Sequence, residues 1–177
     1  MGKPDTDYTR HYGAVMKALT SRGLLLGTYD AAGKANLMTI GWGAAGSIWG
    51  LPMWIVLVRP SRYTYQCIEH SGCFTVNVPT EAMGMACTVC GTKSGRDTDK
   101  PAECRLKVHR ASHVMAPEVA ECPIVYQCQV VHSNDVVPSR LNGEILGGAY
   151  MGADYHRIYF GKIIAIRVDP DAGARLA

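Results

Sequence analysis

The sequence predicts a mainly β protein, a β-barrel with short helices, and three observations support this fold class. Gly and Pro recur about every ten residues, and the segments between them are rich in Val, Ile, Thr, Tyr and Trp, which favour strands. A turn at 31–34 separates two such segments, Leu24–Asp30 and Ala35–Gly41, which predicts a β-hairpin. Met53–Val58 is wholly apolar, as expected of a strand buried on both faces in a closed barrel, although a buried helix also fits this pattern.

A short helix is predicted over Ser61–His70. Tyr65, Ile68 and Glu69 recur there at spacings of three and four residues. Ser61 is available as the N-cap, and Gly72 would end the helix.

The rest of the chain continues the mainly β pattern. After the first helix, the sequence predicts a strand, a second short helix and a polar, irregular segment, at Cys73–Val78, Thr80–Cys90 and Gly91–Glu103. Three further strands are predicted at Ile124–His132, Glu144–Met151 and Ile158–Val168.

The bulk composition predicts one domain over residues 1–177, with a core at about 23–169. A content of 47% hydrophobic and 19% charged residues can fill a proper core. The net charge of +3 is modest and no run of five like charges occurs, so no nucleic-acid or membrane partner is expected. No apolar stretch approaches the roughly 20 residues of a membrane span, and the N-terminus lacks a signal-peptide core, which predicts a cytoplasmic protein.

The seven cysteines are an odd number in a chain with no export signal, so structural disulfides are not expected. Cys87 and Cys90 form a CxxC motif, which could be a redox dithiol or half of a metal site. We favour buried or half-buried thiols, because the motif ends a predicted helix and no second Cys/His pair accompanies it. His109, His113 and His132 also lack ligand-like spacing, so no metal is predicted.

Two segments have the composition of an anion site. A bound phosphate needs several converging donors, which helix N-termini and Gly-containing turns supply. In Arg59–Thr64, two guanidinium groups and two hydroxyls gather where a helix is predicted to begin. In Gly91–Lys100, small, hydroxylic and basic residues alternate. Either segment alone could instead be a solvated turn.

Four motifs, in order and spacing, resemble those of a known family. They are Asn36-Leu37-Met38-Thr39 followed by Trp42, Arg59-Pro60-Ser61-Arg62-Tyr63-Thr64, Phe74-Thr75-Val76-Asn77-Val78-Pro79, and Cys90-Gly91 leading to Ser94-Gly95-Arg96-Asp97 and Asp99-Lys100. On these motifs the chain, from about Gly23 to Asp169, resembles the flavin reductase-like proteins, including the flavoredoxins.

The resemblance implies a six-stranded split barrel of Greek-key type that forms a homodimer, with FMN near the subunit interface. Its implied ring-binding residues are Asn36, Met38 and Thr39, with Trp42 close by. The implied phosphate-binding segments contain Arg59, Ser61, Arg62, Tyr63 and Thr64, together with Ser94, Gly95 and Lys100. Asn77 would hold the ribityl side, although it could equally be a strand-end residue that caps a turn.

His156 lies five residues before Gly161 and resembles a histidine that approaches the flavin in family members. It would then serve as the catalytic residue, because an imidazole can exchange a proton near neutral pH. A surface imidazole is the alternative.

The resemblance implies a flavoprotein oxidoreductase that passes electrons from NADH or NADPH through FMN to a free flavin or a redox partner protein. No Rossmann GxGxxG follows a predicted strand, so the nicotinamide would bind in an open cleft. The alternative is a flavoredoxin-type electron-transfer protein without nicotinamide turnover. A third reading is a ligand-binding module without turnover.

Overall fold

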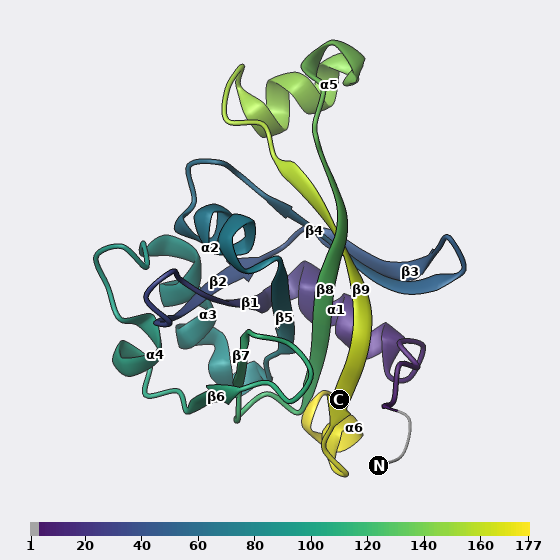
Figure 1. Cartoon of the computed structure of the whole chain (residues 1–177), viewed down its shortest axis with the longest axis vertical. Helices are drawn as coiled ribbons and strands as arrows, with labels where there is room; N and C mark the ends of the chain where they lie inside the picture. Colours follow the sequence, from purple (N-terminus) through teal and green to yellow (C-terminus); the bar gives the residue numbers. More distant parts are fainter. Residues whose placement is uncertain (1–3) are drawn as a thin grey trace.

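An antiparallel sheet of seven strands organises the chain, and the computed structural model describes it over residues 4–177 (Figure 1). The strands run in the spatial order β2-β1-β5-β8-β9-β4-β3. Their bounds are β1 Leu24–Tyr29, β2 Ala35–Ile40, β3 Gly43–Ile48, β4 Leu51–Val58, β5 Cys73–Val78, β8 Ile124–Asp135 and β9 Arg157–Val168. A separate two-stranded sheet pairs β6 (Val108–Arg110) with β7 (Pro117–Val119).

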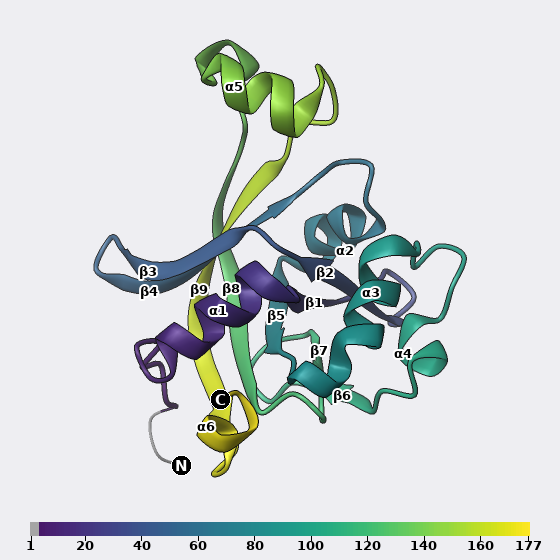
Figure 2. The same ribbon diagram turned by 180° about the vertical axis from the view of Figure 1, so that it is seen from behind.

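Short helices surround this sheet. They are α1 (Tyr12–Ser21), α2 (Tyr63–Ser71), η1 (Glu81–Met83), α3 (Gly84–Thr92), α4 (Lys100–Glu103), η2 (Pro138–Arg140), α5 (Gly143–Ile145), the π-helical turn η3 (Leu146–Tyr150) and α6 (Ala172–Arg175). Figure 2 shows α1 crossing the sheet, into which it buries Val15, Ala18 and Leu19. Within residues 4–177 no helix has both the length and the apolar character to span a membrane.

The strand order contains a Greek-key arrangement. β5, β8 and β9 lie side by side, whereas β4, which precedes β5 in the chain, pairs with β9 on the far side. The two edges, β2 and β3, come from separate hairpins and do not pair with each other in the described chain. The sheet is therefore open, and the sequence-based expectation of six strands is wrong: seven are present.

β3 is the strand of the seven-stranded sheet that the sequence did not reveal, and the short strands β6 and β7 were not predicted either. The sequence of β3, Gly-Ala-Ala-Gly-Ser-Ile, has little intrinsic strand propensity, yet it pairs along its length with β4. β4 itself exposes part of one face, since Trp54 and Val56 are buried whereas Ile55 and Leu57 are only half-buried. The prediction that Met53–Val58 is buried on both faces is therefore wrong, because Leu57 faces the pocket described below.

The core lies between the inner faces of β4, β5, β8 and β9. Every residue of β5 is buried. Trp54 of β4 packs edge-on against Tyr126 of β8, with ring centroids 5.5 Å apart. Phe74 of β5 lies against Gly161 of β9, where a Cβ atom would be 2.3 Å from the Phe74 Cζ atom. A glycine is therefore needed at position 161 for β9 to pack against the Phe74 ring.

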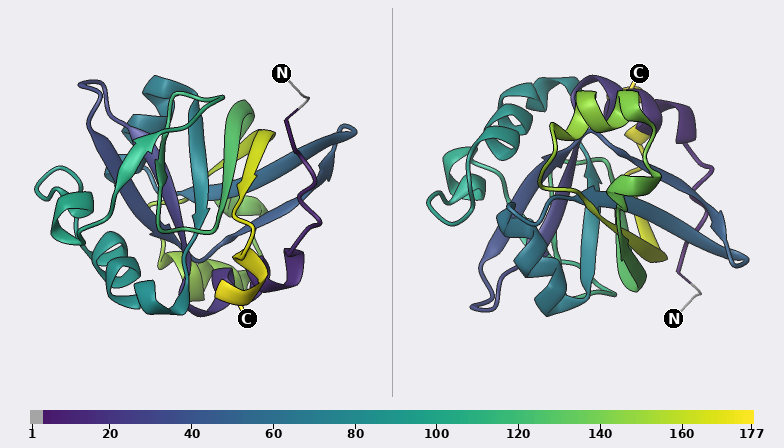
Figure 3. Two further views of the ribbon diagram at one scale, coloured as in Figure 1. Left: turned by 90° about the horizontal axis from the view of Figure 1, so that it is seen from below. Right: turned by 90° about the horizontal axis from the view of Figure 1, so that it is seen from above.

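β8 and β9 extend beyond the core and carry a protruding connection. Residues 131–135 of β8 are exposed, and irregularities in the register between Gln127 and Cys128 and between Val130 and His132 interrupt the β8–β9 pairing. The connection contains η2, α5 and η3 and stands away from the sheet (Figure 1). Seen along the long axis, the α3–α4 segment and the β3–β4 hairpin project on opposite sides (Figure 3).

The predicted strand over Glu144–Met151 is wrong, because this segment forms α5 and η3. The Asn142 side chain accepts a hydrogen bond of 2.7 Å from the Glu144 N–H and begins the helical turn. Much of this segment is exposed, and it lies away from the strands of the sheet, so no neighbouring strand pairs with it.

The remaining local predictions agree more closely with the structure. The β1–β2 hairpin, β5, α2 and α3 are confirmed, and β8 and β9 extend the predicted strands slightly. Gly72 ends α2 in the left-handed conformation, with φ of 64°. The N-cap of α2 is Arg62 rather than Ser61, and no side chain caps it. Helices α1, α4 and α6 were not predicted, and α4 lies in the segment Gly91–Glu103 that was expected to be irregular.

Gly161→Ala tests the close contact between β9 and β5. The added methyl group would overlap the Phe74 ring, so we expect a loss of about 1–3 kcal/mol in the free energy of unfolding. Urea unfolding followed by tryptophan fluorescence measures this loss. Gly46→Ala in edge strand β3 is the matched control, because a Cβ there meets nothing within 4 Å. Equal stability of the two variants would contradict this account of the core.

Candidate functional site

Two neighbouring pockets form one groove between the end of β2, the start of α2 and the α3–α4 loop. The Trp42 pocket has a volume of about 210 Å³ and is lined by Met38, Thr39, Ile40, Gly41, Trp42, Leu57, Arg59, Arg62, Gly91 and His156. The Lys100 pocket has a volume of about 130 Å³ and is lined by Met38, Ser61, Arg62, Tyr63, Thr64, Cys90, Gly91, Thr92, Lys93, Ser94, Gly95, Arg96 and Lys100. Both pockets share Met38, Arg62 and Gly91, so they are contiguous.

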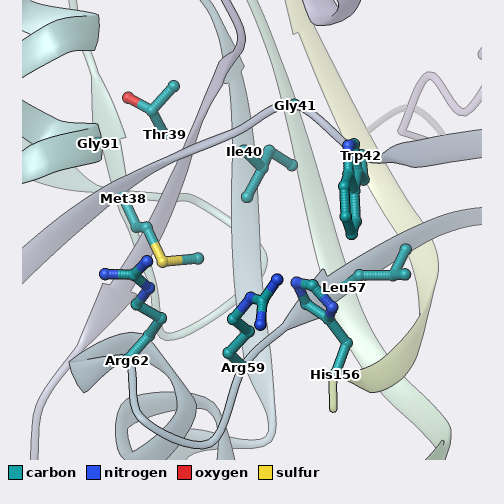
Figure 4. A pocket seen from close by; sticks show the side chains of 10 residues that line it. All are labelled: Met38, Thr39, Ile40, Gly41, Trp42, Leu57, Arg59, Arg62, Gly91 and His156. Carbon is teal, nitrogen blue, oxygen red and sulfur yellow. The ribbon is translucent and has the colours of Figure 1, made fainter. Parts of the chain in front are cut away.

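Strand ends position the walls of the Trp42 pocket. β2 ends at Ile40, and Gly41 and Trp42 turn the chain into β3; β4 ends at Val58 and delivers Arg59. In Figure 4 the Met38 side chain lies on one side of the space, Trp42 and His156 lie together on the other, and Arg59 extends between them. The result is a slot with an aromatic wall and cationic side chains.

Thr39 lines the slot, but its side chain is engaged elsewhere. Its hydroxyl donates a 2.6 Å hydrogen bond to the Cys87 carbonyl of α3. This bond ties β2 to α3, so Thr39 could offer a ligand mainly its backbone.

His156 is buried beside Trp42, with 8% of its surface exposed and the ring centroids 5.0 Å apart. Its Nδ1 atom lies 2.9 Å from the Tyr150 hydroxyl. Burial, followed by the nearby positive charge of Arg59, lowers the pKa of His156 from 6.5 to about 4. The imidazole is therefore neutral at physiological pH. Its burial rules out a surface imidazole, whereas the catalytic role expected of His156 stays a prediction.

Arg59 and Ser61 are held by the β8–β9 connection. The Arg59 guanidinium donates to the carbonyls of Ala149, at 2.7 Å, and Asp154, at 3.2 Å, and lies over the Tyr150 ring. The Asp154 carboxylate accepts from the Ser61 N–H and hydroxyl, at 3.1 and 2.6 Å. The Ser61 hydroxyl is therefore already engaged by an acidic group.

Lys100 is the feature that most clearly suggests a ligand. Its side chain is buried, with 4% exposed, and its Nζ donates to the Cys90 carbonyl at 3.1 Å. Within residues 4–177 it takes part in no salt bridge, and no Asp or Glu lines either pocket. Burial lowers the pKa of Lys100, and nearby Arg62 lowers it further. An anion in this pocket would stabilise a charge that now lacks a counterion.

Gly95, which lines the Lys100 pocket, packs tightly against the Asn36 side chain. The Asn36 amide donates to the hydroxyls of Thr64, at 2.9 Å, and Thr28, at 3.3 Å, whereas its buried Oδ1 has no partner among the described residues. A Cβ atom at Gly95 would lie 2.1 Å from that Oδ1. Only glycine fits this approach, which lets the loop backbone come close to the site.

These features fit a phosphate-bearing ligand with a flat ring. The start of α2 adds backbone N–H donors to the cationic side chains of Arg62 and Lys100 at one end of the groove. The Trp42 pocket at the other end is open and has an aromatic wall, so a planar ring could lie in it. The residues present could therefore hold a flavin mononucleotide. Within residues 4–177 no cluster of three or more His, Cys, Asp or Glu side chains could hold a metal ion.

Asn77 lies outside both pockets. Its amide donates to the Leu25 carbonyl and the Thr75 hydroxyl, both at 3.0 Å, and its Oδ1 accepts from the Val119 N–H at 2.8 Å. Asn77 thus joins β1, β5 and β7. The structure brings it neither to the ribityl side of the groove nor to a turn cap.

Tyr150 and Asp154 are the site residues that the sequence did not indicate. Tyr150 contacts His156 and Arg59, and Asp154 contacts Ser61. The predicted strand over Glu144–Met151 did not indicate this position, because it is the π-helical turn η3 that sets Tyr150 against His156 and Arg59. A helix-starting signal was present in Asn142 and Glu144.

Comparison with known families agrees with this geometry. The model of the flavin reductase like domain matches residues 16–177, which is nearly the whole chain. No match was found among curated proteins.

Solved structures include similar proteins over most of the chain. The flavoredoxin of Desulfovibrio vulgaris (Miyazaki F) is 26% identical, with a TM-score of 0.68 over 84% of this chain and 69% of that chain. The flavoredoxin from Methanosarcina acetivorans is 30% identical, with a TM-score of 0.67 over 84% and 68%. A flavin reductase-type protein with a split barrel domain from Shewanella frigidimarina is 18% identical and shares the fold, with a TM-score of 0.66 over 97% and 82%. This chain belongs to the flavin reductase-like family.

Proposed function

We propose that this protein binds FMN along the groove, with the isoalloxazine ring in the Trp42 pocket and the phosphate in the Lys100 pocket. We further propose that it acts as an NAD(P)H-dependent flavin reductase-like oxidoreductase. The buried ammonium of Lys100, which has no acidic partner among the described residues, is the observation that carries the FMN assignment. The similarity to two flavoredoxins supports it.

Each part of the groove has a distinct task in this proposal. Lys100, Arg62 and Ser94 bind the phosphate, and Gly95 allows the loop backbone to approach it. Asn36 lies outside both pockets, and its Oδ1 packs against Gly95, so Asn36 shapes the loop backbone. When bound, FMN supplies the hydride and electron chemistry, while the protein binds and orients it.

Trp42 and His156 flank the open side of the ring pocket. Trp42 is 47% exposed, so a nicotinamide or an acceptor can reach the pocket past it. His156 is neutral and fixed by Tyr150, which makes it a positioning residue that presents a ring nitrogen to the pocket. Its expected contribution is orientation and hydrogen bonding rather than acid–base exchange at neutral pH.

A flavoredoxin-type electron carrier is the second candidate function. The two flavoredoxins reach 26% and 30% identity, and the Trp42 side of the groove is open enough for a partner protein to approach. In this case FMN would exchange electrons with a redox partner protein, and NADH or NADPH would not be a substrate.

A homodimer is also proposed, with the flavin site near the subunit interface. Large apolar side chains are exposed beside the groove and on the protruding connection. These are Trp42, Val137, Ile145 and Met151. A second copy packed against these side chains would cover them.

Arg62→Ala and Lys100→Met test the phosphate assignment. Each removes a charged donor, so we expect FMN affinity to fall by about 1.5–3 kcal/mol, which corresponds to about 10- to 150-fold, with little effect on riboflavin. Titration with flavin fluorescence as the readout measures both ligands. The exposed Lys107→Met is the control, because Lys107 lines neither pocket. An equal loss for FMN and riboflavin would refute the phosphate assignment.

Anaerobic mixing of the FMN-loaded protein with NADH or NADPH separates the two functions. A reductase should lose its flavin absorbance rapidly, because hydride reaches a ring that lies open beside Trp42. A carrier should keep its colour until a protein or chemical reductant is added. Persistent colour with both nicotinamides would therefore overturn the reductase proposal.

The pH dependence of stability tests the buried, neutral state of His156. Its pKa is about 4 in the folded protein and 6.5 when unperturbed, so between these values the unfolded chain binds a proton that the folded one does not. The free energy of unfolding should then fall as the pH drops from about 6.5 to 4, by on the order of 3 kcal/mol for this residue. Urea unfolding of wild type and His156→Gln at several pH values measures the contribution. Parallel profiles would show that His156 is not buried in this way.

A further inference from the structure

The loop that carries Ser94, Gly95 and Lys100 is closed at its base. Lys93 Nζ and Glu103 Oε1 form an ion pair at 2.6 Å, although they are ten residues apart. Lys100 Nζ donates to the Cys90 carbonyl, and the Cys104 N–H donates to the Lys100 carbonyl at 2.9 Å. The end of α3 and the end of α4 are therefore held side by side.

Two thiols lie at this closure. Cys90 lies near the end of α3 and Cys104 directly follows α4, so the two residues flank the closed loop. Both residues also belong to one apolar cluster, together with Cys87, Cys122 and Leu25. The two side chains thus share one apolar environment at the base of the loop.

The two thiols differ in access. Among the seven cysteines, all of which lie in the described chain, only Cys104 is partly exposed. It lines a surface groove with Met85, Val89 and Arg105, whereas Cys90 is buried behind it and borders the Lys100 pocket. A reagent from solvent therefore meets Cys104 first, and Cys90 is in place to react second.

The CxxC motif is not the reactive pair in this structure. Cys87 is buried in α3, and its carbonyl is held by the Thr39 hydroxyl. Neither thiol of the motif is exposed to solvent, so among the cysteines of this cluster only Cys104 can be reached from outside.

We propose that Cys90 and Cys104 are a thiol pair that a hydroperoxide converts into a disulfide across the base of the 91–103 loop. The Cys104 thiolate attacks a peroxide oxygen, the O–O bond breaks, and Cys104 becomes a sulfenic acid as an alcohol or water leaves. The Cys90 sulfur then attacks the Cys104 sulfur, the S–O bond breaks, and a second water leaves. The two thiols lose two electrons and two protons in total, and the peroxide accepts them.

The disulfide would regulate the phosphate end of the groove, and this part rests on the proposed FMN function. Ser94, Gly95 and Lys100 all lie between the two cysteines, so a covalent bond at the base restricts how far the loop can open. A restricted loop loses less freedom when a phosphate binds, and FMN affinity should rise. Burial raises the pKa of the Cys104 thiol, so oxidation should accelerate as the pH rises.

Peptide mapping tests the bond itself, without reference to FMN. The full-length protein is treated with hydrogen peroxide at pH 8, its free thiols are alkylated, and non-reduced peptides are analysed by mass spectrometry. A Cys90–Cys104 linkage that persists in Cys87→Ala and disappears in Cys104→Ser is the expected result. A Cys87–Cys90 or Cys87–Cys104 linkage, or a Cys104 that oxidises further without any linkage, would overturn the proposal.

The FMN dissociation constant tests the consequence. It should fall several-fold on oxidation of wild type, return after reduction with dithiothreitol, and stay constant in Cys104→Ser. An unchanged constant in a protein with the mapped disulfide would overturn the regulatory effect. Disulfide formation in a protein that binds FMN in neither state would support the thiol pair and instead refute the proposed function.

Discussion

The pairing of β8 with β9 is the constraint on which the rest of the structure depends. β8 pairs with β5 on one side, and β9 pairs with β4 on the other, so this ladder joins the β1–β2–β5 half of the sheet to the β3–β4 half. The groove lies where these halves meet, with Met38 from one and Leu57 from the other. Because the two strands also run past the core, their connection returns over the site and delivers Tyr150, Asp154 and His156.

Charge and burial divide the groove into two chemically different ends. At the Lys100 end, Lys100 is buried with a single acceptor and Arg62 adds a second positive charge, an arrangement that is costly without an anion. At the Trp42 end, burial and then the positive charge of Arg59 lower the pKa of His156. Arg59 lies between the two ends, held by backbone carbonyls rather than by a carboxylate, so its charge also remains available to a ligand. The protein thus offers a permanent positive field along the length of the groove.

Cysteine residues of α3 lie next to the loop that forms the Lys100 pocket. Cys90 contributes its carbonyl to Lys100, its side chain to the apolar cluster against which Cys104 packs, and part of the pocket wall. Thr39 links the neighbouring Cys87 carbonyl to β2. The Cys90 residue therefore borders the pocket in which the phosphate is proposed to bind. In our proposal, oxidation of Cys90 and Cys104 acts on phosphate binding through this pocket.

The sequence by itself determined the elements whose patterns are local: the β1–β2 hairpin, α2 with its Gly72 terminus, β5, and the two cationic segments that the structure joins in one groove. Only the tertiary structure decided the rest. β3 is a strand because β4 pairs with it. Glu144–Met151 contains the helical turns α5 and η3, which lie outside the sheet. The polar atoms of the Asn77 side chain form hydrogen bonds with β1, β5 and β7. Likewise, the pKa of His156 is lowered because the fold buries the ring and brings Arg59, which is far away in the sequence, close to it. Propensity and turn chemistry act over a few residues, whereas pairing, burial and charge environment depend on partners that the fold brings from far along the chain.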